Sequence, residues 1–210
     1  MLPEGVAVHI TRLRLVGGTS DELLAMTDKV EEAAELVSHA GADLIAFHCT
    51  AVSTFNSEME VSLKRRITAA TSKPAVTTSE ALVAAFRALN ARRIVLLSPY
   101  TKEVNDREIA FFEHHGITVL HEIGLTLNGG AAYSEVEPSS WYKLAMVNRH
   151  PDADAYFLSC TTIRATPIIS ILERDMAKPV VTSNQAMVWH ALRVGGLRDF
   201  VEGFGTLFSH

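Results

Sequence analysis

Two cysteines are the residues best suited to chemistry in this chain, because they occupy matching places in an internal repeat. The segment ADLIAFHCT at residues 42–50 returns as ADAYFLSCT at residues 153–161, which makes Cys49 and Cys160 equivalent positions. A duplicated fold brings equivalent strand ends together across a pseudo-twofold axis, so we expect the two thiols to face each other over one cleft. That arrangement suits chemistry at a single carbon with a sulfur on each side.

Hydroxyl residues and a predicted helix N-terminus follow each cysteine. In the first copy of the repeat Thr50 and Ala51 follow Cys49, and in the second copy Thr161 and Thr162 follow Cys160. Free N–H groups at such positions stabilise a thiolate, or they hold the carboxylate of a substrate. Two other interpretations stay open at this point: a pair of buried core thiols, and a disulfide.

Two further residues are candidates for substrate contact. Tyr100 follows the apolar run 94–97, and its phenol could donate a hydrogen bond to a carboxylate or an enolate. The alternative is a tyrosine packed in a loop. Asn128, which precedes two glycines, is either a ligand contact or a turn former.

The sequence carries no pattern for a metal or a nucleotide cofactor. Its nine histidines form no cluster with carboxylates at metal-ligand spacing, and residues 128–130 (NGG) do not fit the dinucleotide-binding pattern. We therefore expect a mechanism that needs no cofactor and no metal.

Composition excludes several classes of partner. The 210 residues are 48% hydrophobic and 20% charged, with a net charge of −5 and no long basic run, so nucleic acid and anionic membranes are not expected to bind. No apolar run reaches membrane-spanning length, and residues 1–5 lack a secretory signal pattern. We expect a cytoplasmic protein with reduced thiols and a small-molecule substrate. Its oligomeric state is left open, with a homodimer among the alternatives.

Alternating strand and helix patterns predict an α/β fold with parallel sheets and helices on both faces. Ligands of such sheets bind at the carboxyl ends of the strands, where both cysteines are expected. Strands are predicted at residues 6–10, 44–47, 73–78, 93–98, 117–120, 156–159 and 178–182. Helices are predicted at residues 23–37, 57–71, 80–89, 103–115, 141–149, 167–176 and 185–194, with a turn at residues 17–20.

The repeat divides the chain into two flavodoxin-like halves with the active site in the cleft between them. Residues 1–90 form the N-terminal half, residues 91–195 the second half, and residues 196–210 a C-terminal tail that packs back on the first half. The second half has a strand and a helix, roughly residues 92–115, ahead of its repeated segment, and nothing in the first half corresponds to them. We therefore expect the first β-α unit to be missing from the N-terminal half.

At these residues the chain resembles the Asp/Glu racemase superfamily, and within it the branch of maleate cis-trans isomerase and arylmalonate decarboxylase. The matching stretches are residues 42–53, 98–107, 158–162 and 179–186. Arylmalonate decarboxylases keep only the second cysteine and have glycine at the first position, whereas both are present here, as in maleate isomerases and two-base racemases.

The resemblance implies a role for each candidate. Cys49 would be the nucleophile, Cys160 the proton donor or partner, and Tyr100 and Asn128 would contact substrate carboxylates. We therefore expect a cofactor-independent, maleate isomerase-like enzyme acting on a small dicarboxylate. The alternatives are an Asp/Glu-type racemase, an arylmalonate-type decarboxylase, and a non-catalytic protein that binds dicarboxylates.

Overall fold

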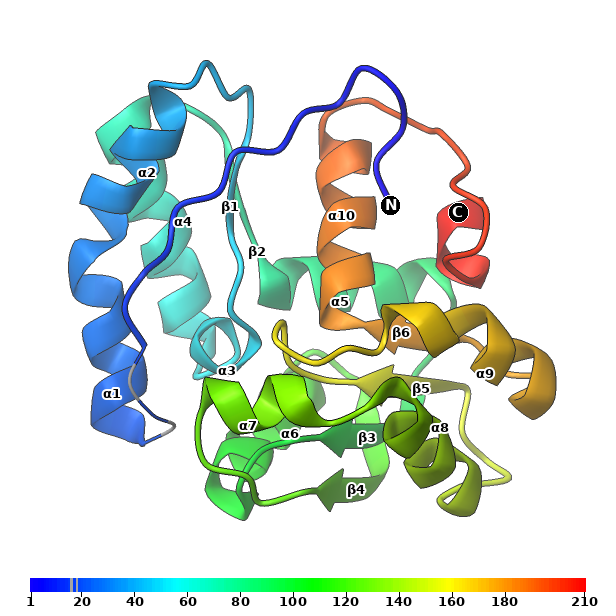
Figure 1. The fold of residues 1–210 in the computed structure, drawn as a ribbon. Helices are drawn as coiled ribbons and strands as arrows, with labels where there is room; N and C mark the ends of the chain where they lie inside the picture. Colours follow the sequence, from blue (N-terminus) through cyan, green and yellow to red (C-terminus); the bar gives the residue numbers. More distant parts are fainter. Residues whose placement is uncertain (16, 18) are drawn as a thin grey trace.

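Helices and strands alternate along most of the chain (Figure 1). The structure is a computed structural model, and it describes residues 1–15, 17 and 19–210. The strands are β1 (Ile45–Phe47), β2 (Ala75–Thr77), β3 (Arg93–Ser98), β4 (Thr118–Gly124), β5 (Ala155–Leu158) and β6 (Val180–Thr182). The helices are α1 (Ser20–Ala25), α2 (Val30–Ser38), α3 (Thr50–Ser53), α4 (Ser57–Thr71), α5 (Thr78–Ala88), α6 (Lys102–His114), α7 (Gly130–Glu135), α8 (Pro138–Val147), α9 (Ile169–Met176) and α10 (Ser183–Val194), with 3₁₀ turns η1 (Met26–Lys29), η2 (Thr166–Ile168) and η3 (Thr206–Ser209).

The strands form two sheets in which every described pairing is parallel. One sheet has the order β1-β2 and the other has the order β4-β3-β5-β6. Parallel neighbours need crossover connections, and helices supply them throughout the chain. The predicted α/β fold with parallel sheets is therefore confirmed.

Three strands of the four-stranded sheet, β3, β5 and β6, are buried on both faces, and the successive side chains of each point to opposite sides. Val95 and Leu97 of β3 pack into a core shared with α8 and α9, and Ile94 and Leu96 pack into a second core with α5, α6 and α10. A continuous apolar run is typical of such a strand, which explains why β3 matches its predicted range.

The expected strand at residues 6–10 is wrong. These residues have no regular secondary structure, and the side chains of Val8 and Ile10 are 56% and 79% exposed. In the repeat this segment corresponds to the start of β4, which pairs with β3. The described residues of the first half contain no counterpart of β3, so the segment has no neighbour with which to form a ladder.

Two features of the first half differ in detail from the prediction. The helix expected at residues 23–37 is divided into α1, η1 and α2. Of the turn expected at residues 17–20, Gly18 lies outside the described residues. Thr19 caps α1 in a reciprocal pair of hydrogen bonds. Its hydroxyl oxygen accepts from the Glu22 backbone N–H, and the Glu22 carboxylate accepts from the Thr19 backbone N–H.

The C-terminal segment is fixed by hydrogen bonds to α9 and α10. Trp189 Nε1 donates to the His210 carbonyl at 3.2 Å, and the Thr206 N–H donates to the Glu173 carboxylate at 2.7 Å. Leu207 also shares the core that contains Phe86 of α5.

The division of the chain at residues 90 and 195 stays a prediction. None of the described helices is long and apolar enough to cross a membrane.

Candidate active site

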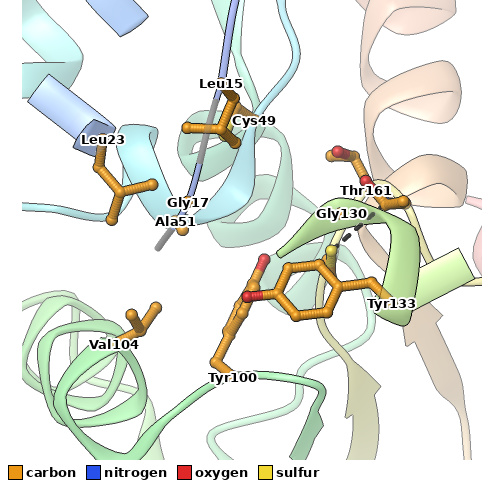
Figure 2. Close-up of a pocket in the computed structure, with 12 residues that line it drawn as sticks. Leu15, Gly17, Leu23, Cys49, Ala51, Tyr100, Val104, Gly130, Tyr133 and Thr161 are labelled. Atoms are coloured by element: carbon orange, nitrogen blue, oxygen red, sulfur yellow. Dashed lines mark hydrogen bonds between the residues drawn. The ribbon is translucent and has the colours of Figure 1, made fainter. Parts of the chain in front are cut away.

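A cleft contains both cysteines, together with residues from helices α1, α3, α6 and α7 and from the loops between elements (Figure 2). It has about 430 Å³ of empty space, its open mouth included. Its described lining consists of Leu15, Gly17, Leu23, Cys49, Ala51, Tyr100, Val104, Gly130, Tyr133, Cys160, Thr161 and Thr162. The fold therefore brings six of the predicted site residues together at the carboxyl ends of β1, β3 and β5.

Cys49 stands between the end of β1 and the first turn of α3. Its backbone is extended, with φ −151°, and it is the residue that precedes the helix. Burial raises the pKa of the Cys49 thiol to about 12, while hydrogen bonds from the backbone N–H groups of Val52 and Ala51 act in the opposite direction. The thiol is therefore neutral at pH 7.

Cys160 has a strained backbone, with φ +100°, in a region that residues with a side chain rarely adopt. This turn brings the N–H of Thr162 to 3.4 Å from the Cys160 sulfur. Burial raises the pKa of Cys160, and a hydrogen bond from Tyr100 partly offsets that effect. A protonated thiol beside a phenol donor is suited to delivering a proton.

Two tyrosines meet edge to face in the cleft. The ring centroids of Tyr100 and Tyr133 are 5.7 Å apart, and Figure 2 shows both rings between Val104 and Thr161. Burial raises the pKa of both phenols, so both are hydrogen-bond donors at neutral pH. Sequence reasoning missed Tyr133 because α7 is a six-residue helix that begins at Gly130 and is too short to show a helical period.

One wall of the cleft is apolar. It comes from Leu15, from Leu23 of α1 and from Val104 of α6, and Figure 2 shows Leu23 and Val104 on the same side. None of the described lining side chains carries a charge. These residues were not predicted, since their apolar character is equally typical of ordinary core positions.

Two predicted contact residues lie outside the lining. Thr50 is buried, and its hydroxyl donates to Ser183 Oγ at 2.8 Å. Asn128 is exposed at the end of the segment that leads into α7. Substrate contact by these two residues stays a prediction.

A buried carboxyl group lies behind the second cysteine. The hydroxyl of Ser159, the residue before Cys160, donates to Glu108 Oε1 at 2.8 Å. Burial raises the pKa of Glu108 to about 8, and the hydrogen bond from Ser159 acts against the rise. The carboxyl group is therefore protonated at neutral pH, and it supports the cysteine loop without adding a charge.

No group of three or more metal-ligating side chains that could hold a metal ion occurs among the residues that the structure describes. The chemistry available in the cleft is that of two thiols, two phenols, hydroxyls and backbone N–H groups.

Comparison with known proteins agrees with this arrangement. The family model "Arylmalonate decarboxylase" matches residues 3–208. The chain belongs to this family. The predicted membership of the maleate isomerase and arylmalonate decarboxylase branch is thus confirmed.

Relatives within the family include both kinds of enzyme. The arylmalonate decarboxylase of Bordetella bronchiseptica is 29% identical over 193 residues, covering 88% of this chain and 79% of that protein. A maleate isomerase of Pseudomonas putida is 25% identical over 214 residues, covering 99% and 86%. A crystal structure of a Pseudomonas putida maleate isomerase variant with maleate has a TM-score of 0.91 at 25% identity, covering 95% of this chain and 82% of that one.

Proposed function

We propose that the protein is a cofactor-independent isomerase that converts maleate to fumarate through Cys49 and Cys160. One observation carries this proposal: both thiols line one cleft, and backbone N–H groups point at each sulfur. Similarity to maleate isomerases over nearly the whole chain supports the same substrate.

The reaction begins at Cys49, whose thiol gives its proton to solvent, and whose sulfur then adds to one carbon of the double bond; the thiolate released at the end of the cycle takes a proton back from solvent. The electron pair of that bond moves onto the adjacent carboxylate, which becomes an enediolate. Tyr100, Thr161, Thr162 and the local N–H groups donate hydrogen bonds to its oxygens. The former double bond is now a single bond, so the two carboxylates can rotate apart.

Cys160 donates a proton to this intermediate and removes it again. In one order of steps, the Cys160 thiol protonates the enediolate carbon and its thiolate then removes the same proton. The carbon–sulfur bond to Cys49 breaks as the double bond forms again, now with trans geometry, and fumarate leaves. No atom is gained or lost, as an isomerisation requires.

The apolar wall favours a second candidate, an arylmalonate-type decarboxylase. A malonate with an apolar substituent could place that group against Leu23 and Val104. Carbon dioxide would leave one carboxylate, and Cys160 would protonate the resulting enediolate. A racemase would use both thiols, one to remove an α-proton and the other to return one on the opposite face.

Proton NMR separates these functions. We expect the fumarate signal to grow when the protein is incubated with maleate in D₂O, and to be lost with Cys49→Ser. Loss of carbon dioxide from an arylmalonate without isomerisation of maleate would support the decarboxylase. Binding of these acids without turnover would instead support the non-catalytic alternative.

We also propose a cytoplasmic location, because the two unpaired cysteines suit a reducing compartment. A homodimer is the simplest assembly to test, and light scattering after size-exclusion chromatography measures it.

A further inference from the structure

One buried hydroxyl connects the loops of the two cysteines. Ser183, the first residue of α10, is fully buried. Its oxygen accepts a hydrogen bond from the Thr50 hydroxyl at 2.8 Å and another from the Cys160 backbone N–H at 3.2 Å. Thr50 directly follows Cys49, so a single atom contacts both loops.

The Ser183 bridge holds two backbone segments that determine where the sulfurs of Cys49 and Cys160 lie. The Cys160 N–H belongs to the residue with φ +100°, which persists only if its surroundings hold it. Thr50 begins α3, whose N–H groups point at the Cys49 sulfur. A shift of the Ser183 oxygen would therefore move both sulfurs relative to each other.

The equivalent corner of the first half lies between β2 and α5. In the described hydrogen bonds it contacts the loop of Cys49 and not that of Cys160. Thr78 occupies the place of Ser183 in the repeat, and its hydroxyl contacts the Phe47 carbonyl and His48 Nδ1, at 3.3 and 3.1 Å. The neighbour of Ser183, Asn184, adds a second tie to the first loop through its Oδ1, which is 2.8 Å from His48 Nε2. The corner between β6 and α10 therefore contacts both cysteine loops and fixes their positions relative to each other.

We propose that Ser183 is a positioning residue that sets the separation of the Cys49 and Cys160 sulfurs. It does not line the cleft, so it acts through the two loops and not on the substrate. The inference rests on the proposed function in one respect, which is that the two thiols work as a pair.

Arsenite measures this separation without any substrate. Each arsenic–sulfur bond forms when a thiol proton leaves with an arsenite hydroxide as water, and one arsenic atom takes two thiols only if both sulfurs reach it. Native mass spectrometry of the reduced protein gives the affinity and stoichiometry, and protection from iodoacetamide identifies the cysteines that are bound.

We expect the unaltered protein to bind one arsenic through both cysteines, and Ser183→Ala to bind it roughly tenfold more weakly, since two neutral hydrogen bonds are lost. Ser183→Thr should restore binding, because the equivalent Thr78 shows that a threonine fits such a corner. Ser79→Ala is the matched control. Ser79 is equally buried at the start of α5, but its hydroxyl contacts Thr77 and Glu60.

Thr50→Val is a second, independent variant if Ser183→Ala does not fold, because it removes one hydroxyl from the same bridge while keeping the side-chain shape. We expect it to weaken two-thiol binding as well, and the effects of the two variants to be less than additive. Unchanged arsenite affinity in the folded variants would overturn the positioning role and leave the cysteine-pair function intact. Failure of the unaltered protein to form a two-thiol adduct would overturn both.

Discussion

The backbone N–H of Thr162 lies 3.4 Å from the sulfur of Cys160, two residues earlier in the chain. This contact depends on the left-handed backbone of Cys160, because an extended strand would carry the sulfur away from the following N–H groups. At Cys49 the equivalent contacts come from the first turn of α3. The two halves thus place N–H donors on their sulfurs by different local geometries.

The first prediction concerns the two thiols. Cys49→Ser and Cys160→Ser should each lower turnover of the substrate by about 10²-fold or more, since a hydroxyl is a far weaker nucleophile and acid than a thiol at these positions. The fold should be retained, because oxygen replaces sulfur with little change in volume. Enzyme assays and thermal unfolding followed by circular dichroism measure the two effects. Near-normal rates for both variants would exclude the cysteine-pair mechanism.

The reactivity of Cys49 should depend strongly on pH. Its pKa of about 12 means that the thiolate fraction grows about tenfold per pH unit throughout the neutral and mildly alkaline range. In the Cys160→Ser variant, alkylation of Cys49 by iodoacetamide should therefore accelerate between pH 7 and pH 9.5 without levelling off. A plateau below pH 8 would show that the N–H groups of α3 outweigh burial.

Tyr100 and Tyr133 offer a matched pair of substitutions. The Tyr100 phenol lowers the pKa of Cys160 against the effect of burial, and it is the phenol we assign to the enediolate. Tyr100→Phe should lower the rate by about 10²-fold, the usual effect of removing one such donor. Tyr133→Phe keeps the ring contact and should change the rate far less. Equal losses in the two variants would show that both phenols serve the reacting carboxylate.

Much of this site could be predicted from the sequence because an internal repeat and short apolar runs are visible without knowledge of the tertiary contacts. The repeat aligns Cys49 with Cys160, and the apolar runs before them identify buried parallel strands, one in each sheet, whose carboxyl ends carry the two cysteines into one cleft. The cleft in the structure contains both residues and Tyr100.

The parts that sequence could not predict depend on contacts between distant segments. Residues 6–10 alternate like a strand, yet a strand forms only beside a partner, and pairing is a property of the whole sheet. Leu15 and Leu23 reach the cleft from the first helical region, and nothing in their local pattern separates a cleft wall from a core position. The contact of Ser183 with Thr50 joins residues 133 positions apart, and local sequence patterns do not reveal such a contact.

The last prediction concerns stability and pH. Glu108 has a pKa of about 8 in the folded protein against an ordinary value of 4.5, because burial disfavours its charged form. Between these two values the folded state binds more protons than the unfolded state, so this group makes the protein less stable as pH rises from 4.5 to 8. The slope approaches about 1.4 kcal/mol per pH unit.

Glu108→Gln keeps an oxygen acceptor for Ser159 and removes the titration, so the variant should gain stability relative to the unaltered protein across this window. Urea unfolding at pH 5, 6.5 and 8 measures the difference. Parallel stability curves would mean that the carboxyl group titrates at its ordinary pKa and that Ser159 donates to a carboxylate.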